Sequence, residues 1–107
     1  MRLRNVPGSR EMLAASSYCF ETPGELKGRW QKEFGNQNPV YIEIGMGKGK
    51  FITRLAASHP QINYIGIEKY SSVLVRALEK LEAQPLPNLR LIRMEAENLP
   101  DIFAPGE

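Results

Sequence analysis

Acidic side chains and glycines at the ends of short apolar segments are the residues of this sequence whose types and spacing could do chemistry. The acidic residues are Glu43, Glu68 and Glu95. The glycines begin two residues after the first of them, in the pattern Gly45-x-Gly47-x-Gly49. Glycines let a backbone approach a ligand closely, and carboxylates accept hydrogen bonds from hydroxyl and amine groups. The combination predicts a pocket for a ligand that contains a nucleoside.

The spacing of the glycines distinguishes this loop from two common phosphate-binding motifs. The dinucleotide fingerprint G-x-G-x-x-G requires a third glycine where this sequence has Lys50. The G-K-[ST] of a P-loop does not occur at the required spacing. The carboxylate of Glu43 would also repel a pyrophosphate bound at the loop.

S-adenosylmethionine meets these requirements, because it has no phosphate and carries an ammonium and a sulfonium group. We expect Glu43 near the methionine moiety of this cofactor and Glu68 at both ribose hydroxyls. Glu95, followed by Ala96, is expected to reach the exocyclic amine of the adenine. Taken alone, Glu43 or Glu68 could equally be a solvated carboxylate at the end of a strand. The combination of both with the glycines favours a ligand-binding role.

Alternating strands and helices must position these residues. The β-prone segments lie at residues 40–44, 62–67 and 89–94. Helical spacing of apolar residues after the glycines predicts a helix that stops at Pro60. Ser71 or Ser72 is expected to cap a second helix. Its apolar stripe is Val73, Leu74, Ala77, Leu78 and Leu81.

This alternation predicts right-handed βαβ units and a parallel sheet. The expected fold class is therefore α/β: the first βαβαβ half of a doubly wound, Rossmann-type parallel sheet, with strand order 3-2-1. The carboxyl ends of parallel strands meet at one edge, so the acidic residues would converge there. The first strand would be left as an uncovered edge, and its apolar run implies a missing neighbour.

Two regions are expected along the chain. Residues 1–38 would be an N-terminal extension, with short helices over 10–17 and 25–34. Leu26, Trp30 and Phe34 recur on one face of the second helix, which predicts packing rather than base stacking. Residues 39–107 would be the first, incomplete half of the S-adenosylmethionine-binding domain.

Composition limits the class of protein. The 107 residues carry a net charge of +2 and no run near the roughly 20 apolar residues of a membrane span. The start of the sequence lacks the apolar core of a signal peptide, and one Cys with one His cannot build a Cys/His zinc site. We therefore expect a cytoplasmic protein with no membrane and no metal partner.

Several segments resemble bacterial tRNA (guanine-N7-)-methyltransferases. The segment YIEIGMGKGKFI at residues 41–52 resembles the first motif of this family. The segments INYIGIE at 62–68 and SVLV at 72–75 resemble the second motif and the helix after it. The segments MRLRN at 1–5 and KGRW at 27–30 resemble the Gram-positive branch.

The resemblance implies an S-adenosylmethionine-dependent, Rossmann-type enzyme that methylates N7 of a guanosine in the tRNA variable loop. It assigns cofactor binding to Glu43, Glu68 and Glu95, although the family usually has Asp or Asn at the last position. Arg2 and Arg4 would help to hold tRNA. The family's Ser-Asp-Pro-Trp-Pro-Lys motif, with its catalytic aspartate, is expected beyond residue 107, so no catalytic residue is assigned.

Two alternative functions stay open at this point. The chain could belong to another Rossmann-type methyltransferase with a small-molecule or protein substrate. It could also be a non-enzymatic nucleotide-binding half-domain that pairs with a partner chain, and the exposed edge permits a homodimer. Finally, a sheet of this type needs about twice this length, which predicts that the 107 residues are a fragment, inactive when alone.

Overall fold

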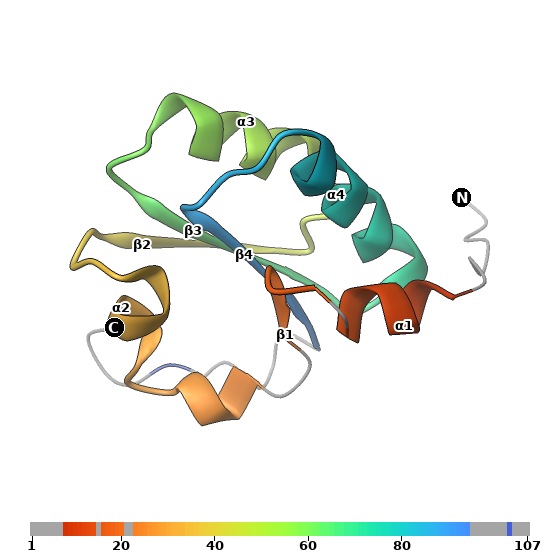
Figure 1. The fold of residues 1–107 in the computed structure, drawn as a ribbon, viewed down its shortest axis with the longest axis horizontal. Coiled ribbons are helices and arrows are strands. Elements are labelled where there is room, and N and C mark those ends of the chain that lie inside the picture. The colour runs from red at the N-terminus through yellow and green to blue at the C-terminus, as the bar shows by residue number, and fades with distance from the viewer. Residues whose placement is uncertain (1–7, 15, 21–22, 95–102, 104–107) are drawn as a thin grey trace.

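The computed structural model describes residues 8–14, 16–20, 23–94 and 103. The helices are α1 (Ser9–Ala14), a 3₁₀ helix (Pro23–Leu26), α2 (Trp30–Phe34), α3 (Lys50–Ser58) and α4 (Ser71–Ala83). The strands are β1 (Cys19–Phe20), β2 (Val40–Ile44), β3 (Asn63–Glu68) and β4 (Leu89–Arg93). Figure 1 shows these strands as one sheet below α3 and α4.

The sheet is parallel throughout and has the order β1-β4-β3-β2. The three strands expected from the sequence therefore lie in the predicted 3-2-1 order. β1 pairs with the far side of β4 and was not predicted, because two residues are too few to show a period of alternation. In the described part of the chain β2 is at the end of the sheet, with Tyr41 and Ile44 about half exposed.

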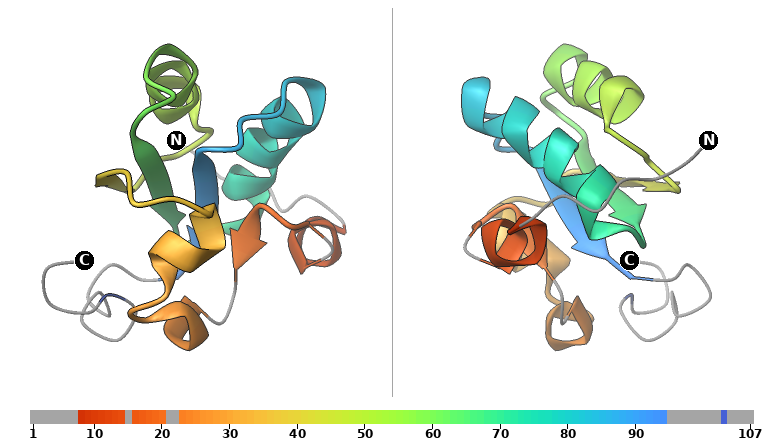
Figure 2. Two further views of the ribbon diagram at one scale, coloured as in Figure 1. Left: turned by 60° about the vertical axis from the view of Figure 1, so that its left-hand side comes forward. Right: turned by 90° about the vertical axis from the view of Figure 1, so that its right-hand side faces the viewer.

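Both long helices cover the same face of the sheet (Figure 2). In α3, Ile52 and Ala56 are buried, four residues apart on one side of the helix. In α4, the predicted apolar stripe is confirmed except for Val73, which is only partly buried. The buried residues of that stripe are Leu74, Ala77, Leu78 and Leu81.

The opposite face packs on Trp30, which is fully buried among Ile65, Ile67 and Ile92 of the sheet. The predicted packing role of Trp30 is therefore confirmed. The prediction of one continuous helix over residues 25–34 is wrong, because the chain forms a 3₁₀ helix and then α2. Gly28 lies between these two helices at φ +77°, a backbone conformation that does not occur within a right-handed helix.

Two helix starts or ends also differ from the predictions. The N-cap of α4 is Tyr70, not Ser71 or Ser72, and the Tyr70 side chain makes no capping hydrogen bond. The Glu68 carboxylate accepts a hydrogen bond from the Tyr70 backbone N–H and so holds the turn that leads into the helix. The helix expected over residues 10–17 is shorter, since Ser16 and Ser17 lie outside α1.

No helix in the described ranges has both the length and the apolar character needed to cross a membrane.

Candidate cofactor site

The glycine loop leaves β2 with a backbone that glycine favours. Gly45, Gly47 and Gly49 have φ values of +70°, +59° and +78°, a region that L side chains rarely adopt. The backbone N–H groups of Gly45 and Met46 donate to the carbonyl of Ile67, at 2.8 and 3.0 Å. The loop is therefore bound to the carboxyl end of the neighbouring strand, at the edge where the sequence predicted a pocket.

Glu68 is the acidic residue that joins this loop to the rest of the edge. Its Oε1 accepts a hydrogen bond from the Gly47 N–H at 3.1 Å, and its Oε2 accepts one from the Tyr70 N–H at 3.1 Å. The residue is only 8% exposed. A carboxylate offers about four lone-pair sites, so each oxygen can accept a further hydrogen bond.

Glu43 lies on β2 with Gly66 of β3 as its register partner. Its Oε1 is shielded from solvent and has no hydrogen-bond partner within the described part of the chain. Desolvation by this burial raises the pKa of the Glu43 carboxyl above its usual range. A buried acceptor without a partner is costly, and it would be satisfied by a donor such as an ammonium group.

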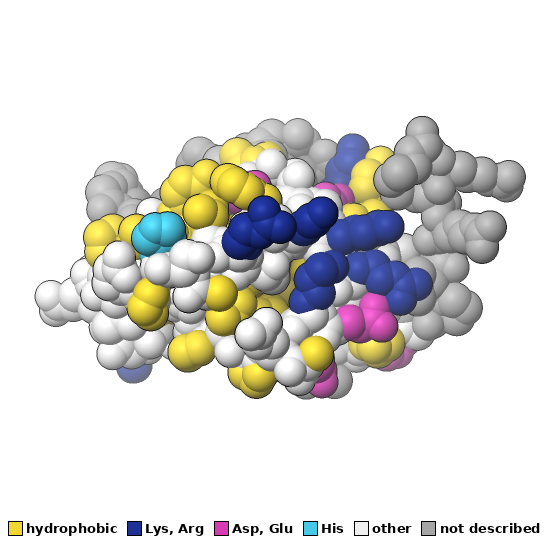
Figure 3. All heavy atoms as spheres, turned by 90° about the horizontal axis from the view of Figure 1, so that it is seen from above, with side chains coloured by type: hydrophobic (Ala, Val, Ile, Leu, Met, Phe, Trp, Pro, Cys, Tyr) yellow, Lys and Arg dark blue, Asp and Glu magenta, His cyan; other side chains and the backbone are white. Residues whose placement is uncertain are grey.

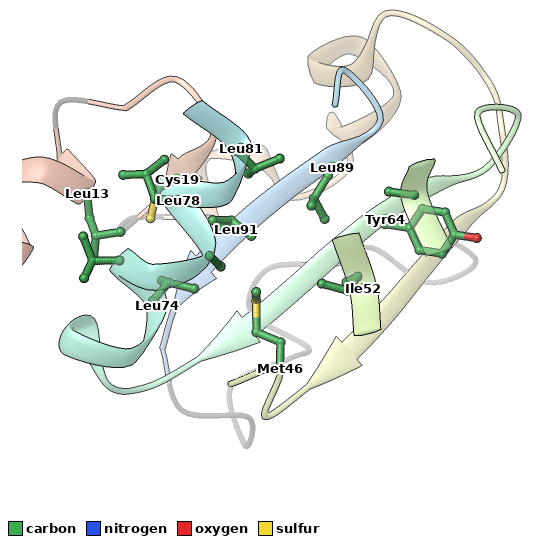
Figure 4. Packing of buried hydrophobic residues seen from close by; sticks show 13 residues of the cluster. Leu13, Cys19, Met46, Ile52, Tyr64, Leu74, Leu78, Leu81, Leu89 and Leu91 are labelled. Atoms are coloured by element: carbon green, nitrogen blue, oxygen red, sulfur yellow. The ribbon is translucent and has the colours of Figure 1, made fainter. Parts of the chain in front are cut away.

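The loop is seated by close packing that the sequence analysis did not identify. Met46 is buried and is directed into the cluster between the sheet and the two long helices (Figure 4). It occupies the space that a side chain at position 66 would need, since a Cβ on Gly66 would overlap the Met46 sulfur. Likewise, a Cβ on Gly49 would lie 2.8 Å from the Cβ of Ala77. The glycine of the buried run INYIGIE was the sequence signal for this close approach.

Basic side chains lie within the loop and beside it. Lys48 and Lys50 are both exposed to solvent. The Lys80 ammonium donates to the Lys48 carbonyl at 3.1 Å, which connects α4 to the loop. His59 contacts the carbonyl of Leu55 through Nδ1, at 3.1 Å, in the position expected for a histidine at the end of a helix.

The structure brings Glu68 and the three glycines together and places Glu43 on the strand that precedes them. Glu95, Ala96, Arg2 and Arg4 lie outside the described residues. Sequence analysis did not identify Tyr70, whose backbone N–H donates a hydrogen bond to Glu68 at this edge. Among the described residues, no group of three His, Cys, Asp or Glu side chains could hold a metal ion.

A parallel half-sheet with a glycine loop and carboxylates at its carboxyl edge defines the Rossmann-type class of nucleoside-binding α/β folds. The chain belongs to a methyltransferase family: the family model described as "Putative methyltransferase" matches residues 37–107.

Curated relatives match the whole chain, and two of the most similar have the same name. A tRNA (guanine-N(7)-)-methyltransferase of Lachnoclostridium phytofermentans is 60% identical over 107 residues, which are 100% of this chain and 50% of that protein. A protein of the same name from a Geobacillus species is 56% identical over 108 residues, 100% of this chain and 49% of that protein. The chain thus spans about half the length of these relatives.

A solved structure also shares the fold. The antibiotic-resistance methyltransferase Kmr superposes with a TM-score of 0.53 at 20% identity, over 64% of this chain and 37% of that chain. This similarity supports the Rossmann-type arrangement of the half-sheet.

Proposed function

We propose that this chain supplies the S-adenosylmethionine-binding half of a cytoplasmic tRNA (guanine-N7-)-methyltransferase. Residues 39–107 would be the first half of the cofactor domain, and residues 1–38 an extension packed against it. The observation that carries the proposal is the double hydrogen bonding of the buried Glu68 to Gly47 and Tyr70. The names of the curated relatives support the RNA substrate.

Glu68 is held in an orientation suited to a ribose. The two backbone N–H groups fix both of its oxygens before any ligand arrives, so little side-chain entropy remains to be lost on binding. Both oxygens keep a lone pair for a hydroxyl donor. Burial strengthens such hydrogen bonds, because water competes less for the carboxylate.

Glu43 would complete the polar part of the pocket. Its shielded Oε1 lacks a donor in the described structure, and the ammonium of the methionine moiety would provide one. Glu95 and Ala96 are proposed beside the adenine, and Arg2 and Arg4 as contacts to tRNA.

The residues of this half of the enzyme would need to supply little acid–base chemistry for the reaction. S-adenosylmethionine, when bound, supplies a methyl group on a sulfonium, and guanine N7 has a free lone pair that accepts it without prior loss of a proton. The residues of this chain would bind and orient the cofactor, and catalysis would rest mainly on positioning and electrostatic stabilisation. We assign no catalytic residue within residues 1–107 and expect it in a segment beyond them.

The uncovered edge of β2 would pair with the next strand of such a segment, or with a second copy of the chain.

Calorimetric titration with S-adenosylhomocysteine, with NAD as the control ligand, tests the cofactor class. We expect S-adenosylhomocysteine alone to bind, and Glu68→Gln to weaken it by roughly tenfold or more, the usual scale for losing hydrogen bonds to a charged group. Glu82→Gln, at an exposed position of α4, is the matched control and should leave the affinity unchanged. Equal binding of NAD, or no effect of Glu68→Gln, would contradict the cofactor assignment.

A chimera tests the substrate. The carboxyl-terminal half of the Lachnoclostridium phytofermentans relative would be joined after Glu107 and assayed for methyl transfer to a tRNA transcript. We expect N7-methylated guanosine in the variable loop. Transfer to a small molecule or protein, but not to tRNA, would instead indicate another methyltransferase.

A further inference from the structure

The outer surface of the two long helices carries a groove that the proposed cofactor site does not use. It lies between α3 and α4 and has a volume of about 410 Å³. Its lining residues are Lys50, Thr53, Arg54, Ala57, Lys80, Ala83, Gln84 and Leu86. None of them is acidic, and three are basic.

The three basic residues are directed to solvent along this groove. Lys50 and Arg54 are four residues apart, so they lie on the same side of α3 with Cβ atoms about 5–6 Å from each other. Lys80 faces them from α4, where its ammonium donates to the Lys48 carbonyl. Figure 3 shows Lys and Arg side chains gathered in a band across this face of the molecule.

These charges are not neutralised within the described structure. The ion pairs there are Arg76 with Glu79 and Arg90 with Glu33, and neither includes a residue of the groove. Glu79 is the acidic residue nearest in sequence to Lys80, and its carboxylate is occupied by Arg76. The groove therefore presents a net positive surface to a ligand.

The position of the groove connects it with the cofactor edge. Lys50 begins α3 directly after Gly49, the last glycine of the loop. Arg54 follows one turn later, so the positive side chains run from the carboxyl edge of the sheet outward along the helices. Lines of Lys and Arg in a groove are suited to the evenly spaced phosphates of a nucleic acid backbone.

We propose that the groove between α3 and α4 binds a stretch of RNA phosphate backbone, so that the substrate RNA contacts the outer helical face as well as the strand ends. The inference rests on the proposed function, because it takes RNA as the substrate. It adds Lys50, Arg54 and Lys80 as phosphate contacts that determine affinity and carry no sequence information.

Fluorescence anisotropy with a labelled tRNA transcript tests the proposal on the 107-residue chain. The variant is Lys50→Gln/Arg54→Gln/Lys80→Gln. The matched control is Lys27→Gln/Arg29→Gln/Lys32→Gln, which removes three exposed charges from the face that carries Trp30. At about 0.1 M salt we expect the groove variant to lose at least tenfold in affinity, with a salt slope smaller by roughly two to three, as three fewer phosphate contacts imply. The control variant should change the affinity by less than about threefold.

Two further measurements keep the result specific. Lys50→Arg/Lys80→Arg should retain RNA binding, and circular dichroism should show that every variant is folded. Equal losses in the groove and control variants, no loss in the groove variant, or no RNA binding by the parent chain would each overturn the proposal. Competition by poly-glutamate as strong as by unlabelled tRNA would overturn the assignment to RNA in favour of an acidic protein partner.

The cofactor titration separates this proposal from the one it rests on. If S-adenosylhomocysteine binds while the groove variant retains its RNA affinity, the groove proposal fails and the proposed function stands. If the groove variant loses RNA but S-adenosylhomocysteine does not bind, the proposed function fails and the groove remains an RNA-binding surface.

Discussion

The carboxylate of Glu68 accepts a hydrogen bond from the backbone N–H of Gly47, 21 residues earlier in the chain, at 3.1 Å. This contact joins the end of β3 to the loop that follows β2. The other oxygen of Glu68 holds Tyr70, the N-cap of α4. One buried side chain thus fixes both turns that border the proposed cofactor pocket.

Replacing Glu68 should loosen these turns even without a ligand. In Glu68→Ala, the N–H groups of Gly47 and Tyr70 lose their acceptor, and we expect the free energy of unfolding to fall by about 1–3 kcal/mol. Hydrogen exchange followed by NMR should accelerate at these two amides in particular. Glu82→Ala is the exposed control, and unchanged exchange at Gly47 would contradict the bridging role.

Two glycines of the loop should respond differently to alanine. Gly45→Ala and Gly49→Ala both place a Cβ at positive φ, which costs about 1–2 kcal/mol. Only Gly49 adds a contact, 2.8 Å from the Ala77 Cβ, whereas nothing lies within 4 Å at Gly45. We expect the larger loss of unfolding free energy in Gly49→Ala, measured by urea denaturation. Equal losses would show that Ala77 moves aside without cost.

Gly66 and Met46 should be coupled. Gly66→Ala alone should destabilise the protein by about 1–3 kcal/mol, because the new methyl overlaps the buried Met46 side chain. Met46→Ala alone should cost about 2–5 kcal/mol through the cavity it leaves. The double variant should lose less than the sum, since the added methyl fills part of that cavity. Strict additivity in a double-mutant cycle would contradict the contact.

Asn88 should be important for stability although it lies outside the site. Its side-chain amide is within 2.9–3.1 Å of three carbonyls, those of Ala56, His59 and Ile62, and so ties the end of α3 to the start of β4. Asn88→Asp replaces this donor with an acceptor among carbonyls, and we expect a loss of about 2–4 kcal/mol at neutral pH. Gln61→Glu, an exposed amide-to-acid change in the loop between α3 and β3 that Asn88 contacts, should cost well under 1 kcal/mol.

The partly buried carboxyl of Glu43 should make stability depend on pH. Its pKa is raised in the folded protein, so the folded state binds this proton more tightly than the unfolded state does. The Glu43 contribution to stability therefore decreases as the pH rises from the unfolded pKa, about 4.5, through the higher folded pKa. Glu43→Gln should remove this dependence and be more stable than the parent chain at pH 7. Urea denaturation at several pH values would measure it, and an identical pH profile in the variant would contradict the shift.

The periodic apolar residues determined most of the fold by themselves. The stripe of α4 and the three β-prone runs contain enough residues to show their period, and right-handed βαβ units allow the 3-2-1 order that the structure has. The glycine pattern with Glu43 and Glu68 likewise indicated the edge at which the loop lies. In each case the information is local, and the handedness of βαβ connections limits the arrangements that the strands can take.

Only the tertiary structure decided what surrounds these elements. β1 has two residues and exists because β4 offers it an unpaired edge, which no local pattern encodes. The contact of Met46 with Gly66, the hydrogen bond from Gly47 to Glu68 and the groove beside Lys80 join residues about 20 or more positions apart. Such contacts depend on how strands and helices stack in space, so the sequence could suggest candidate residues for the site but not the hydrogen bonds and packing around them.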